Sequence, residues 1–397
     1  MTKKREWKVN NIVIVGGGAS GMAAAIAAAK EGADVKILEK NPRIGKKILS
    51  TGNGRCNYSN IHADKSAYTQ EFCSYVVEKI TPKYIEIFFK ELGMLSAVED
   101  GRMYPKSMQA SAVLNILRTE IKRLGVDVIT EFDAEKISKT KDGFCVFSKD
   151  GRKVFADAVI MSTGGCAAPK TGSDGTGYKI LKQLGHSITM LKPALCRVKT
   201  DKGIQGVRQY GEVYLDNGIR RAGEIQFAKD ALSGIPVFGL ARYVNRGDSI
   251  YIDLMPEMTE NEVYEYLKDR KCDVLENYLV GILNKSLGQL LMKECGFEPL
   301  SRSASSLNDC DVRKIAKTLK MWKFIAGKPE SWDNAQVTSG GVDVTEVDEK
   351  TMQSKLIPGL YITGELLDVD ADCGGYNLHW AWASCLTAGS EAARCTK

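Results

Sequence analysis

The stretch IVIVGGGASGMAAAIAAAKEGADVKILEK (residues 12–40) decides the expected fold, because it reads as strand, glycine turn, helix and strand in succession. The continuous apolar run 12–15 is typical of a parallel strand that is buried on both faces. An alanine-rich helix follows from about Met22 to Lys30, and residues 33–40 form a second strand that ends on an acidic residue. The segment therefore predicts one βαβ unit of a parallel sheet.

Three glycines in the turn occupy the positions of the GxGxxG fingerprint. Gly16 permits the tight turn, Gly18 lets a pyrophosphate approach the backbone, and Gly21 lets the helix pack close to the strand. The helix N-terminus would offer free N–H groups and the positive end of its dipole to the phosphates. Glu39 is placed to accept hydrogen bonds from the ribose hydroxyls. The pattern predicts a dinucleotide site; the alternative is a glycine-rich turn without a ligand.

Composition excludes several other classes. The net charge of +6 is mild, and no basic stripe follows the four positive charges of the first eight residues, so a nucleic-acid partner is not favoured. The 11 cysteines include no CxxC pair, which argues against a zinc ribbon, a dithiol centre and any other metal site. Glycines interrupt the apolar N-terminal run, so we expect neither export nor a membrane span but a cytoplasmic protein.

The rest of the chain suggests an interrupted domain. We expect helices over 70–92, 107–124 and 172–186, and strands over 126–131, 144–148 and 153–165. Short alternating strands over 191–255 suggest a small barrel or sandwich, and a charged helical pattern with a Thr cap covers 257–330. The expected α/β fold is a Rossmann-like FAD-binding domain of the glutathione-reductase type, interrupted by an inserted β-barrel and helices. Its parts are 1–190 (FAD-binding, first part), 191–256 (barrel), 257–335 (helical) and 336–397 (FAD-binding, second part).

Further glycine turns favour FAD over NAD as the dinucleotide. The segments STGNGRCN (50–57), STGG (162–165), ITGE (362–365) and CGGYN (373–377) are more than a single nicotinamide site needs. An extended FAD requires backbone contacts at several distant segments. The final helix would then direct its N-terminus, Gly374 to Leu378, at the pyrimidine edge of the flavin, where its dipole stabilises negative charge.

The chain resembles the BaiN/YhiN-like NAD(P)/FAD-dependent oxidoreductases, some of which are called aminoacetone oxidases. The resemblance rests on GGGASGMAAA (16–25), GKKILSTGNGRCNYSN (45–60), STGG, DGTGYKILKQLGH (174–186) and the segment 337–384. It implies non-covalent FAD and an inserted barrel-plus-helix domain. The cofactor-binding residues that fingerprint and resemblance together indicate are Gly16, Gly18, Ala19, Ser20, Gly21, Glu39, Lys40, Lys47, Thr51, Gly52, Asn53, Gly54, Arg55, Cys56, Asn57, Ala134, Thr163, Gly164, Gly165, Gly364, Glu365, Gly374, Gly375, Tyr376, Asn377 and Leu378.

Two positions depart from the family pattern. Ala228 and Lys229 stand where members usually have Thr-His, which puts in doubt any substrate role borrowed from that motif. His379 stands where many members have Gln.

No catalytic acid–base pair emerges from the sequence, and three residues are weak candidates. Cys56 is either a small packing residue beside the flavin, a redox or nucleophilic thiol activated by Arg55, or a covalent attachment point. His379 could face the flavin from the first turn of the last helix, or it could be a satisfied helix residue. Tyr376 could line the face of the flavin.

The leading functional hypothesis is a hydride transfer through flavin N5 from transiently bound NAD(P)H to a small organic acceptor. The resemblance implies a carbonyl-conjugated double bond in a hydrophobic acceptor, with bile-acid-like steroids for one branch. One alternative is an FAD-dependent amine oxidase that uses O₂ on an aminoacetone-like substrate, with Asp368, Asp370 or Asp372 as solvated loop carboxylates nearby. The others are an RNA-associated flavoprotein and a protein with purely structural FAD.

Overall fold

The computed structural model describes residues 11–328 and 330–395, and the chain divides into two compact units. Unit 1 comprises the chain up to Lys192 together with the chain from Gln336 onward, and unit 2 is Pro193–Ala335. Strand β11 (Lys192–Ala194) contains the first boundary. Within the described part of the chain, no helix is long and apolar enough to cross a membrane.

A five-stranded parallel sheet forms the centre of unit 1, with the strand order β19-β10-β1-β2-β6. The strands are β1 (Asn11–Val15), β2 (Asp34–Leu38), β6 (Asp127–Ile129), β10 (Ala158–Met161) and β19 (Leu360–Ile362). β1 lies in the middle and is buried from Ile12 to Val15, as the apolar run predicts. The last strand in sequence thus completes the sheet that the first strand begins.

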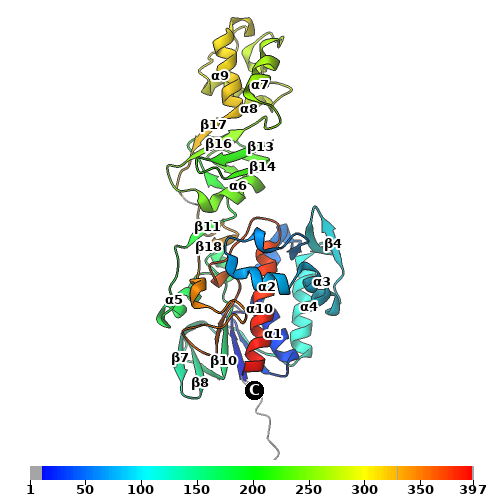
Figure 1. Cartoon of the computed structure of the whole chain (residues 1–397), viewed down its shortest axis with the longest axis vertical. Coiled ribbons are helices and arrows are strands. Elements are labelled where there is room, and N and C mark those ends of the chain that lie inside the picture. The colour runs from blue at the N-terminus through cyan, green and yellow to red at the C-terminus, as the bar shows by residue number, and fades with distance from the viewer. Residues whose placement is uncertain (1–10, 329, 396–397) are drawn as a thin grey trace, which may run out of the picture. The chain divides into compact units, whose positions relative to one another are not determined.

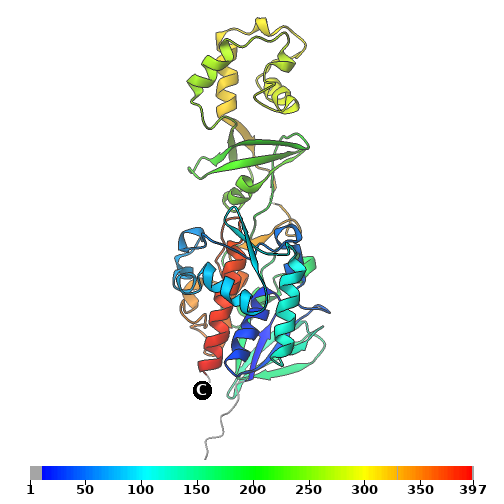
Figure 2. The ribbon, with the colours of Figure 1, turned by 90° about the vertical axis from the view of Figure 1, so that its right-hand side faces the viewer.

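Helices cover one face of this sheet. They are α1 (Ala19–Lys30), α4 (Ala110–Arg123) and α10 (Tyr376–Cys395), which lie side by side in Figure 2 as the blue, cyan and red helices. The two outermost in sequence, α1 and α10, pack very closely, because a Cβ at Gly389 would lie 2.4 Å from the carbonyl oxygen of Ala24. Small residues therefore let the C-terminal helix lie directly against the fingerprint helix.

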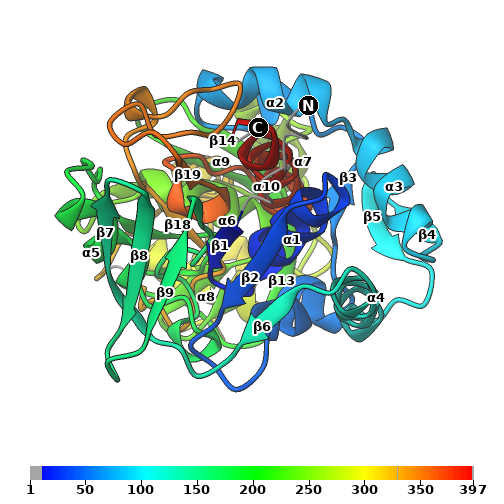
Figure 3. The same ribbon diagram turned by 90° about the horizontal axis from the view of Figure 1, so that it is seen from below.

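Antiparallel strands cover the other face, as Figure 3 shows. They are β7 (Ala134–Thr140), β8 (Gly143–Ser148) and β9 (Lys153–Ala156). The expected single strand over 153–165 is in fact two strands in different sheets, β9 and β10, with Asp157 between them. Asp157 accepts the backbone N–H of Asn11 at 3.0 Å. The sequence analysis missed β7, whose exposed Lys and Glu side chains hide its alternation.

The remaining elements of unit 1 surround the site. They are β3 (Ser59–Asn60), α2 (Ser74–Lys79), α3 (Pro82–Glu91), β4 (Ser96–Glu99), β5 (Arg102–Pro105), α5 (Thr176–Gln183) and β18 (Val337–Ser339). The helical stretch expected over 70–92 is interrupted before Pro82, where the Thr81 side chain caps α3 by accepting the Tyr84 N–H at 3.2 Å.

Unit 2 contains a closed ring of six strands. They are β12 (Val198–Lys199), β13 (Val207–Leu215), β14 (Arg220–Ala228), β15 (Ala231–Ser233), β16 (Ser249–Asp253) and β17 (Trp322–Ile325). The outer strands β12 and β17 are joined because Asp201 N–H donates to Ile325 O at 3.0 Å and Gly327 N–H to Lys199 O at 2.8 Å. β17 lies within the range that we expected to be helical, so the chain leaves the barrel after β16 and returns to it.

Helices fill the excursion between β16 and β17. They are α7 (Glu260–Lys268), α8 (Lys285–Glu294) and α9 (Asp309–Lys320), grouped in Figure 1 at the end of the barrel strands; α6 (Ile235–Leu240) packs on the barrel itself. The predicted cap of α7 is confirmed. Thr259 accepts the Glu262 N–H at 3.3 Å, and the Glu262 carboxylate accepts the Thr259 N–H at 2.8 Å.

Candidate functional site

The glycine turn after β1 has the geometry that the fingerprint predicts. Gly16 has a φ of 103°, and a Cβ there would lie 2.5 Å from the carbonyl oxygen of Ser162. A Cβ on Gly21 would lie 1.8 Å from the Gly16 carbonyl oxygen, so only glycine allows this helix-to-turn contact. A Cβ on Gly18 would meet no atom within 4 Å. The backbone at Gly18 therefore faces open space.

The N-terminus of α1 leaves its N–H groups unused. Its N-cap is Gly18, no side chain caps it, and its first turn contains no acidic residue. Ala19 and Ser20 occupy that first turn, and a Cβ at Gly364 would lie 2.4 Å from Ser20 Oγ. An uncapped helix end beside an open backbone is an anion site of the kind that holds a pyrophosphate.

Glu39 lies at the end of β2 beside the same turn. It is buried, its Oε2 accepts the Gly17 N–H at 2.8 Å, and its Oε1 accepts the backbone and side-chain N–H groups of Asn41 at 2.8 and 2.6 Å. Phe132 N–H donates to the Glu39 carbonyl at 2.9 Å, which brings Ala134, the first residue of β7, close to this acid. The carboxylate is thus fixed where the ribose end of a dinucleotide would lie.

The turn after β10 meets the segment that follows β19. A Cβ at Gly165 would lie 2.2 Å from Thr338 Oγ1 and 3.0 Å from Glu365 Oε1. Thr338 Oγ1 in turn accepts the N–H of Cys166 at 2.7 Å. Gly164, at a φ of 71°, lies against Ser173. Two segments about 200 residues apart in sequence are therefore in direct contact at the carboxyl ends of neighbouring strands.

The GSDGTG segment (172–177) now has a physical explanation that the sequence did not supply. A Cβ at Gly172 would lie 2.5 Å from Asn41 Nδ2, and one at Gly177 would lie 2.0 Å from Thr163 Oγ1. These two glycines let α5 and its entry loop approach the ends of β2 and β10. Asp174 also binds Lys40, with Nζ 2.7 Å from Oδ2, so the predicted cofactor residue Lys40 has an acidic partner.

Lys47 and Glu365 form an ion pair that joins two of the predicted segments. Lys47 Nζ lies 2.8 Å from Glu365 Oε2, and both side chains are partly buried. The other oxygen, Oε1, accepts the Thr338 N–H at 2.8 Å, and the Glu365 carbonyl accepts the Tyr178 hydroxyl at 2.9 Å. Glu365 is therefore held from three sides.

The loop STGNGRCNYSN has a tightly turned backbone. Gly52, Asn53, Gly54 and Cys56 all have positive φ, between 53° and 82°. The Thr51 hydroxyl donates to Ile48 O at 2.7 Å, and the Cys56 N–H donates to Thr51 O at 3.0 Å. The loop is fixed by its own backbone, which answers to a shaped loop and not to a floppy one.

Arg55 and Cys56 point to different partners. The Arg55 guanidinium lies 4.6 Å from the Tyr104 ring centroid and pairs with Glu99 at 3.1 Å. Burial raises the pKa of the Cys56 thiol to about 11, with the Thr51 hydrogen bond lowering it only in part. In this arrangement Arg55 does not activate the thiol, and Cys56 is protonated at neutral pH. The geometry favours the packing role among the three that the sequence left open.

The entry to α10 packs directly on this loop. A Cβ at Gly375 would lie 2.3 Å from Ser59 O and 2.6 Å from Asn57 Oδ1, and that Asn57 oxygen is buried without a hydrogen-bond partner. Gly374 accepts a hydrogen bond from Asn60 Nδ2 at 2.9 Å through its carbonyl. The Asn377 side chain is occupied, because it accepts the Ala371 N–H and donates to the Ala371 carbonyl, both at 3.0 Å.

The catalytic candidates on α10 differ in access. His379 is fully buried, its Nδ1 lies 2.9 Å from Ser59 Oγ, and burial lowers its pKa to about 4, so it is neutral near pH 7. Tyr376 is half-buried, and burial raises the pKa of its phenol above the usual value. No hydrogen bond engages the Tyr376 hydroxyl among the described residues, although its carbonyl accepts the Tyr68 hydroxyl at 3.1 Å. Leu378 is partly buried beside them.

The two tryptophans of α10 are core residues, as the sequence analysis expected. Trp380 Nε1 donates to Gly364 O at 3.1 Å, and Trp382 Nε1 donates to Tyr58 O at 2.9 Å. These bonds tie α10 to the turn after β19 and to the 50–60 loop. The tryptophans therefore position the backbone of the site.

Two sequence interpretations need correction. Asp370 is not a solvated loop acid, because it is buried and its Oδ1 accepts the Thr69 hydroxyl at 3.0 Å. His186, for which the sequence showed no partner, is buried with Nδ1 2.8 Å from Glu346 Oε2 and Nε2 2.9 Å from Ser354 Oγ. Asp368 and Asp372 lie on the same loop as Asp370.

The family departures in unit 2 have a simple location. Ala228 ends β14, and the exposed Lys229 follows it in the turn to β15.

The residues of unit 1 fit FAD. The open backbone at Gly18, the uncapped helix end, the buried Glu39 and the unpartnered Asn57 oxygen supply a pyrophosphate cradle, a ribose acceptor and a polar group near the end of the loop. No cluster of His, Cys, Asp and Glu that could hold a metal ion occurs in residues 11–328 or 330–394.

Comparison with known proteins agrees with this geometry. The sequence profile of the HI0933-like protein Rossmann domain matches residues 10–391. A 3-dehydro-bile acid delta(4,6)-reductase of Clostridium scindens is 37% identical, with 97% of this chain and 99% of the relative aligned. A ribosomal RNA dihydrouridine synthase of Escherichia coli is 28% identical over 94% of this chain and 95% of its own length.

Solved structures share the fold. A 3-ketosteroid delta1-dehydrogenase from Sterolibacterium denitrificans superposes with a TM-score of 0.54 at 15% identity, covering 98% of this chain and all of that one. The open conformation of a flavocytochrome c3 fumarate reductase gives a TM-score of 0.50 at 19% identity, covering 98% of this chain and 78% of that one.

Proposed function

The chain belongs to the HI0933-like Rossmann-domain family of FAD-binding oxidoreductases, and from that premise we propose that it saturates carbon–carbon double bonds conjugated to a carbonyl group. NAD(P)H is the proposed electron donor, bound only transiently. The proposed acceptor is a small, largely apolar molecule of the steroid or bile-acid type.

The observation that carries the proposal is the chemistry common to relatives with different substrates. A delta(4,6)-reductase of a 3-dehydro-bile acid and a synthase of dihydrouridine in RNA both add hydrogen across a double bond conjugated to a carbonyl. The family therefore supports a reaction class more firmly than any one substrate. FAD, when bound, supplies hydride transfer at N5 for such a reaction.

Residues of unit 1 have separate proposed roles in holding FAD. The first turn of α1, with Gly18 at its cap, would bind the pyrophosphate, and Glu39 would accept the ribose hydroxyls. The 51–57 loop would lie along the isoalloxazine. The N-terminus of α10 would direct its N–H groups and dipole at the pyrimidine edge, where negative charge develops.

Tyr376 is the proposed proton donor to the carbon next to the carbonyl. Hydride addition to a conjugated double bond places negative charge on the carbonyl and the adjacent carbon, and that carbon must then be protonated. The Tyr376 phenol remains protonated near neutral pH because burial raises its pKa, and its hydroxyl is not held by another described residue. His379 is a weaker donor because it is neutral and fully buried.

A small acceptor fits this chain better than RNA. The C. scindens relative shares 37% of residues and the E. coli RNA enzyme 28%. Unit 2 contains 21 Lys and Arg against 20 Asp and Glu, so it offers no excess positive charge to a phosphate backbone. RNA uridine is the second candidate substrate because two ribosomal RNA dihydrouridine synthases align along nearly the whole chain.

Anaerobic stopped-flow spectroscopy tests the proposal. The FAD-loaded protein is mixed with NADH or NADPH, and bleaching of the flavin is followed. The reduced protein is then mixed with a 3-oxo-4,6-diene steroid acid, with a uridine-containing RNA or with oxygen. We expect bleaching by one nicotinamide and rapid return of colour with the steroid. Reduction by small amines instead, with fast return in air, would identify an oxidase and refute the proposal.

A further inference from the structure

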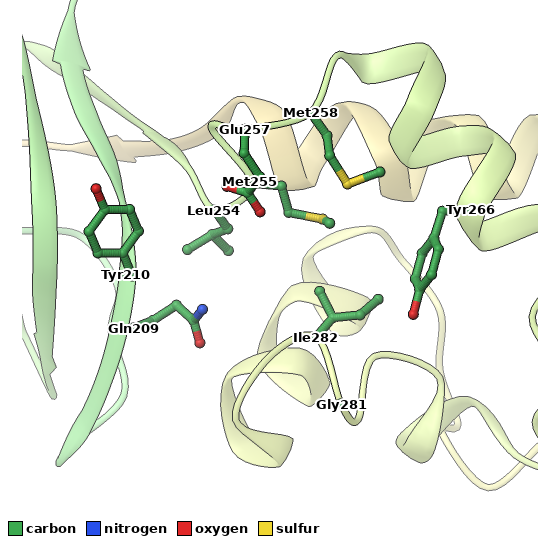
Figure 4. Close-up of a pocket in the computed structure, with 9 residues that line it drawn as sticks. All are labelled: Gln209, Tyr210, Leu254, Met255, Glu257, Met258, Tyr266, Gly281 and Ile282. Carbon is green, nitrogen blue, oxygen red and sulfur yellow. The ribbon is translucent and has the colours of Figure 1, made fainter.

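Unit 2 contains a cavity of about 270 Å³ at the junction of its barrel and its helices. Figure 4 shows the side chains that surround it, from β13, from the loop after β16, from α7 and from the loop before α8. The lining residues are Gln209, Tyr210, Leu254, Met255, Glu257, Met258, Tyr266, Gly281 and Ile282. All of them belong to unit 2, so the cavity is separate from the FAD-site residues of unit 1.

One lysine holds the central wall of this cavity in place. Lys320, at the end of α9, directs its Nζ at Asp253, 2.6 Å away, and donates to the carbonyls of Met255, at 2.6 Å, and of Met258. The other Asp253 oxygen accepts the Met255 N–H at 2.9 Å. The 254–258 loop is therefore fixed before any ligand arrives, and all three N–H donors of Lys320 are in use.

The opposite wall is also held by internal bonds. Arg270 donates through Nη2 to the Val280 carbonyl beside Gly281, and the Tyr278 hydroxyl donates to Leu267 O at 2.8 Å. Neither wall needs to order on binding, which lowers the entropic cost of holding a ligand.

The interior of the cavity is apolar and adaptable, whereas its rim is aromatic. Leu254, Met255, Met258 and Ile282 project toward the same space in Figure 4. Methionine side chains fill irregular shapes and suit a ligand of variable outline. Tyr210 lies across the space from Tyr266, and their exposed fractions are 60% and 52%. Two large aromatic rings thus face solvent at the mouth of an apolar space.

Glu257 places one carboxylate among these groups. It is exposed and makes no ion pair or hydrogen bond among the described residues, and the nearby Lys320 has no donor left for it. The rings of Tyr210 and Tyr266 likewise have no cation over their faces within the described chain, although Arg270 donates to the Tyr266 hydroxyl at 3.4 Å. An unpaired carboxylate between free tyrosine rings is the arrangement that attracts an organic cation.

We propose that this cavity binds a small organic cation, an apolar body carrying an ammonium group. The body lies against Met255, Met258 and Ile282, and the ammonium group faces Glu257 and the tyrosine rings. Anionic ligands of the same shape are disfavoured by the same carboxylate. The site is distinct from the FAD site, so its occupant need not be the substrate.

Nuclear magnetic resonance of the full-length, FAD-loaded protein tests this site. The methionine methyl groups are labelled with carbon-13, and Met255→Leu and Met258→Leu assign the two signals. Benzyltrimethylammonium is the cationic probe, and benzyl alcohol and phenylacetate are its neutral and anionic counterparts. We expect saturable shifts of both signals with the cation, weaker binding of the alcohol, and none of phenylacetate.

Charge variants separate this site from a general electrostatic effect. Glu257→Gln should weaken binding of the cation about fivefold, as expected for a partly exposed carboxylate and ammonium pair. Glu260→Gln removes the same charge from the first turn of α7, outside the cavity, and should leave the affinity unchanged. Absence of shifts at any soluble concentration, equal binding of phenylacetate, or equal effects of the two variants would overturn the proposal.

Discussion

Replacing Gly18 by Ala should abolish FAD binding without weakening the fold. The backbone at Gly18 has φ −77° and ψ −163°, which alanine also adopts, and the new methyl group would meet no protein atom within 4 Å. The free energy of unfolding of the FAD-free protein should therefore change by less than about 1 kcal/mol, because the lost N-cap preference of glycine and the reduced entropy of the unfolded chain oppose each other.

The methyl group would instead occupy the space through which a pyrophosphate reaches the helix N-terminus. We expect FAD affinity to fall at least about 100-fold, which corresponds to about 2.7 kcal/mol. Gly21→Ala is the matched control within the same fingerprint. Its Cβ would lie 1.8 Å from the Gly16 carbonyl oxygen, so α1 would have to shift, at a cost of about 3 kcal/mol or more in unfolding free energy.

Two measurements distinguish the variants. Urea unfolding of the FAD-free proteins, followed by circular dichroism, gives their stabilities, and quenching of flavin fluorescence gives the affinities. The reasoning is refuted if Gly18→Ala binds FAD within about twofold of the natural protein. It is equally refuted if the FAD-free form of that variant is as destabilised as Gly21→Ala.

Four further predictions follow from individual side chains. Ser354→Ala leaves His186 Nε2 and two backbone N–H groups without their partner, so urea unfolding should show a loss of about 2 kcal/mol, and an unchanged midpoint would contradict the network. Cys56 should resist alkylation in the folded protein near neutral pH because its pKa is about 11, a result that peptide mass spectrometry checks and that rapid labelling would overturn. Tyr376→Phe should slow reoxidation by an enone at least about tenfold and leave flavin reduction by NAD(P)H unchanged; the natural rate should stay flat until the pH exceeds the raised pKa of the phenol. His379 has a pKa of about 4 when folded, so below its unfolded value of about 6.5 only the unfolded state gains a proton, and stability should fall by about 3 kcal/mol between those values; His379→Gln should flatten that part of the urea-unfolding profile, and an identical pH dependence would refute the assignment.

The βαβ unit and its glycine roles could be predicted because their signals are local. Strand, turn, helix and acid follow one another within 29 residues, and the structure gives each of Gly16, Gly18 and Gly21 the environment that its position implies. The capping of α7 by Thr259 was predictable for the same reason, since its partner Glu262 lies three residues away.

Long-range contacts explain what the sequence did not give. His186 finds its partners 160 and 168 residues further along, and no spacing pattern connects a histidine to Glu346 or Ser354 over that distance. Gly172 and Gly177 are needed for close approach to segments that precede them, so their role is invisible until the fold brings those segments together. Strand β17 was missed because it follows the helical excursion directly and pairs only with distant strands.

Single-turnover reoxidation of the reduced protein tests the central claim most directly. The FAD-loaded protein is reduced with light in the absence of oxygen and mixed with one equivalent of a 3-oxo-4,6-diene steroid acid. The account predicts that the flavin colour returns in one phase and that the recovered steroid has gained two hydrogen atoms at the conjugated system. A flavin that stays reduced with this acceptor and with uridine-containing RNA, but returns to colour in air, would contradict it.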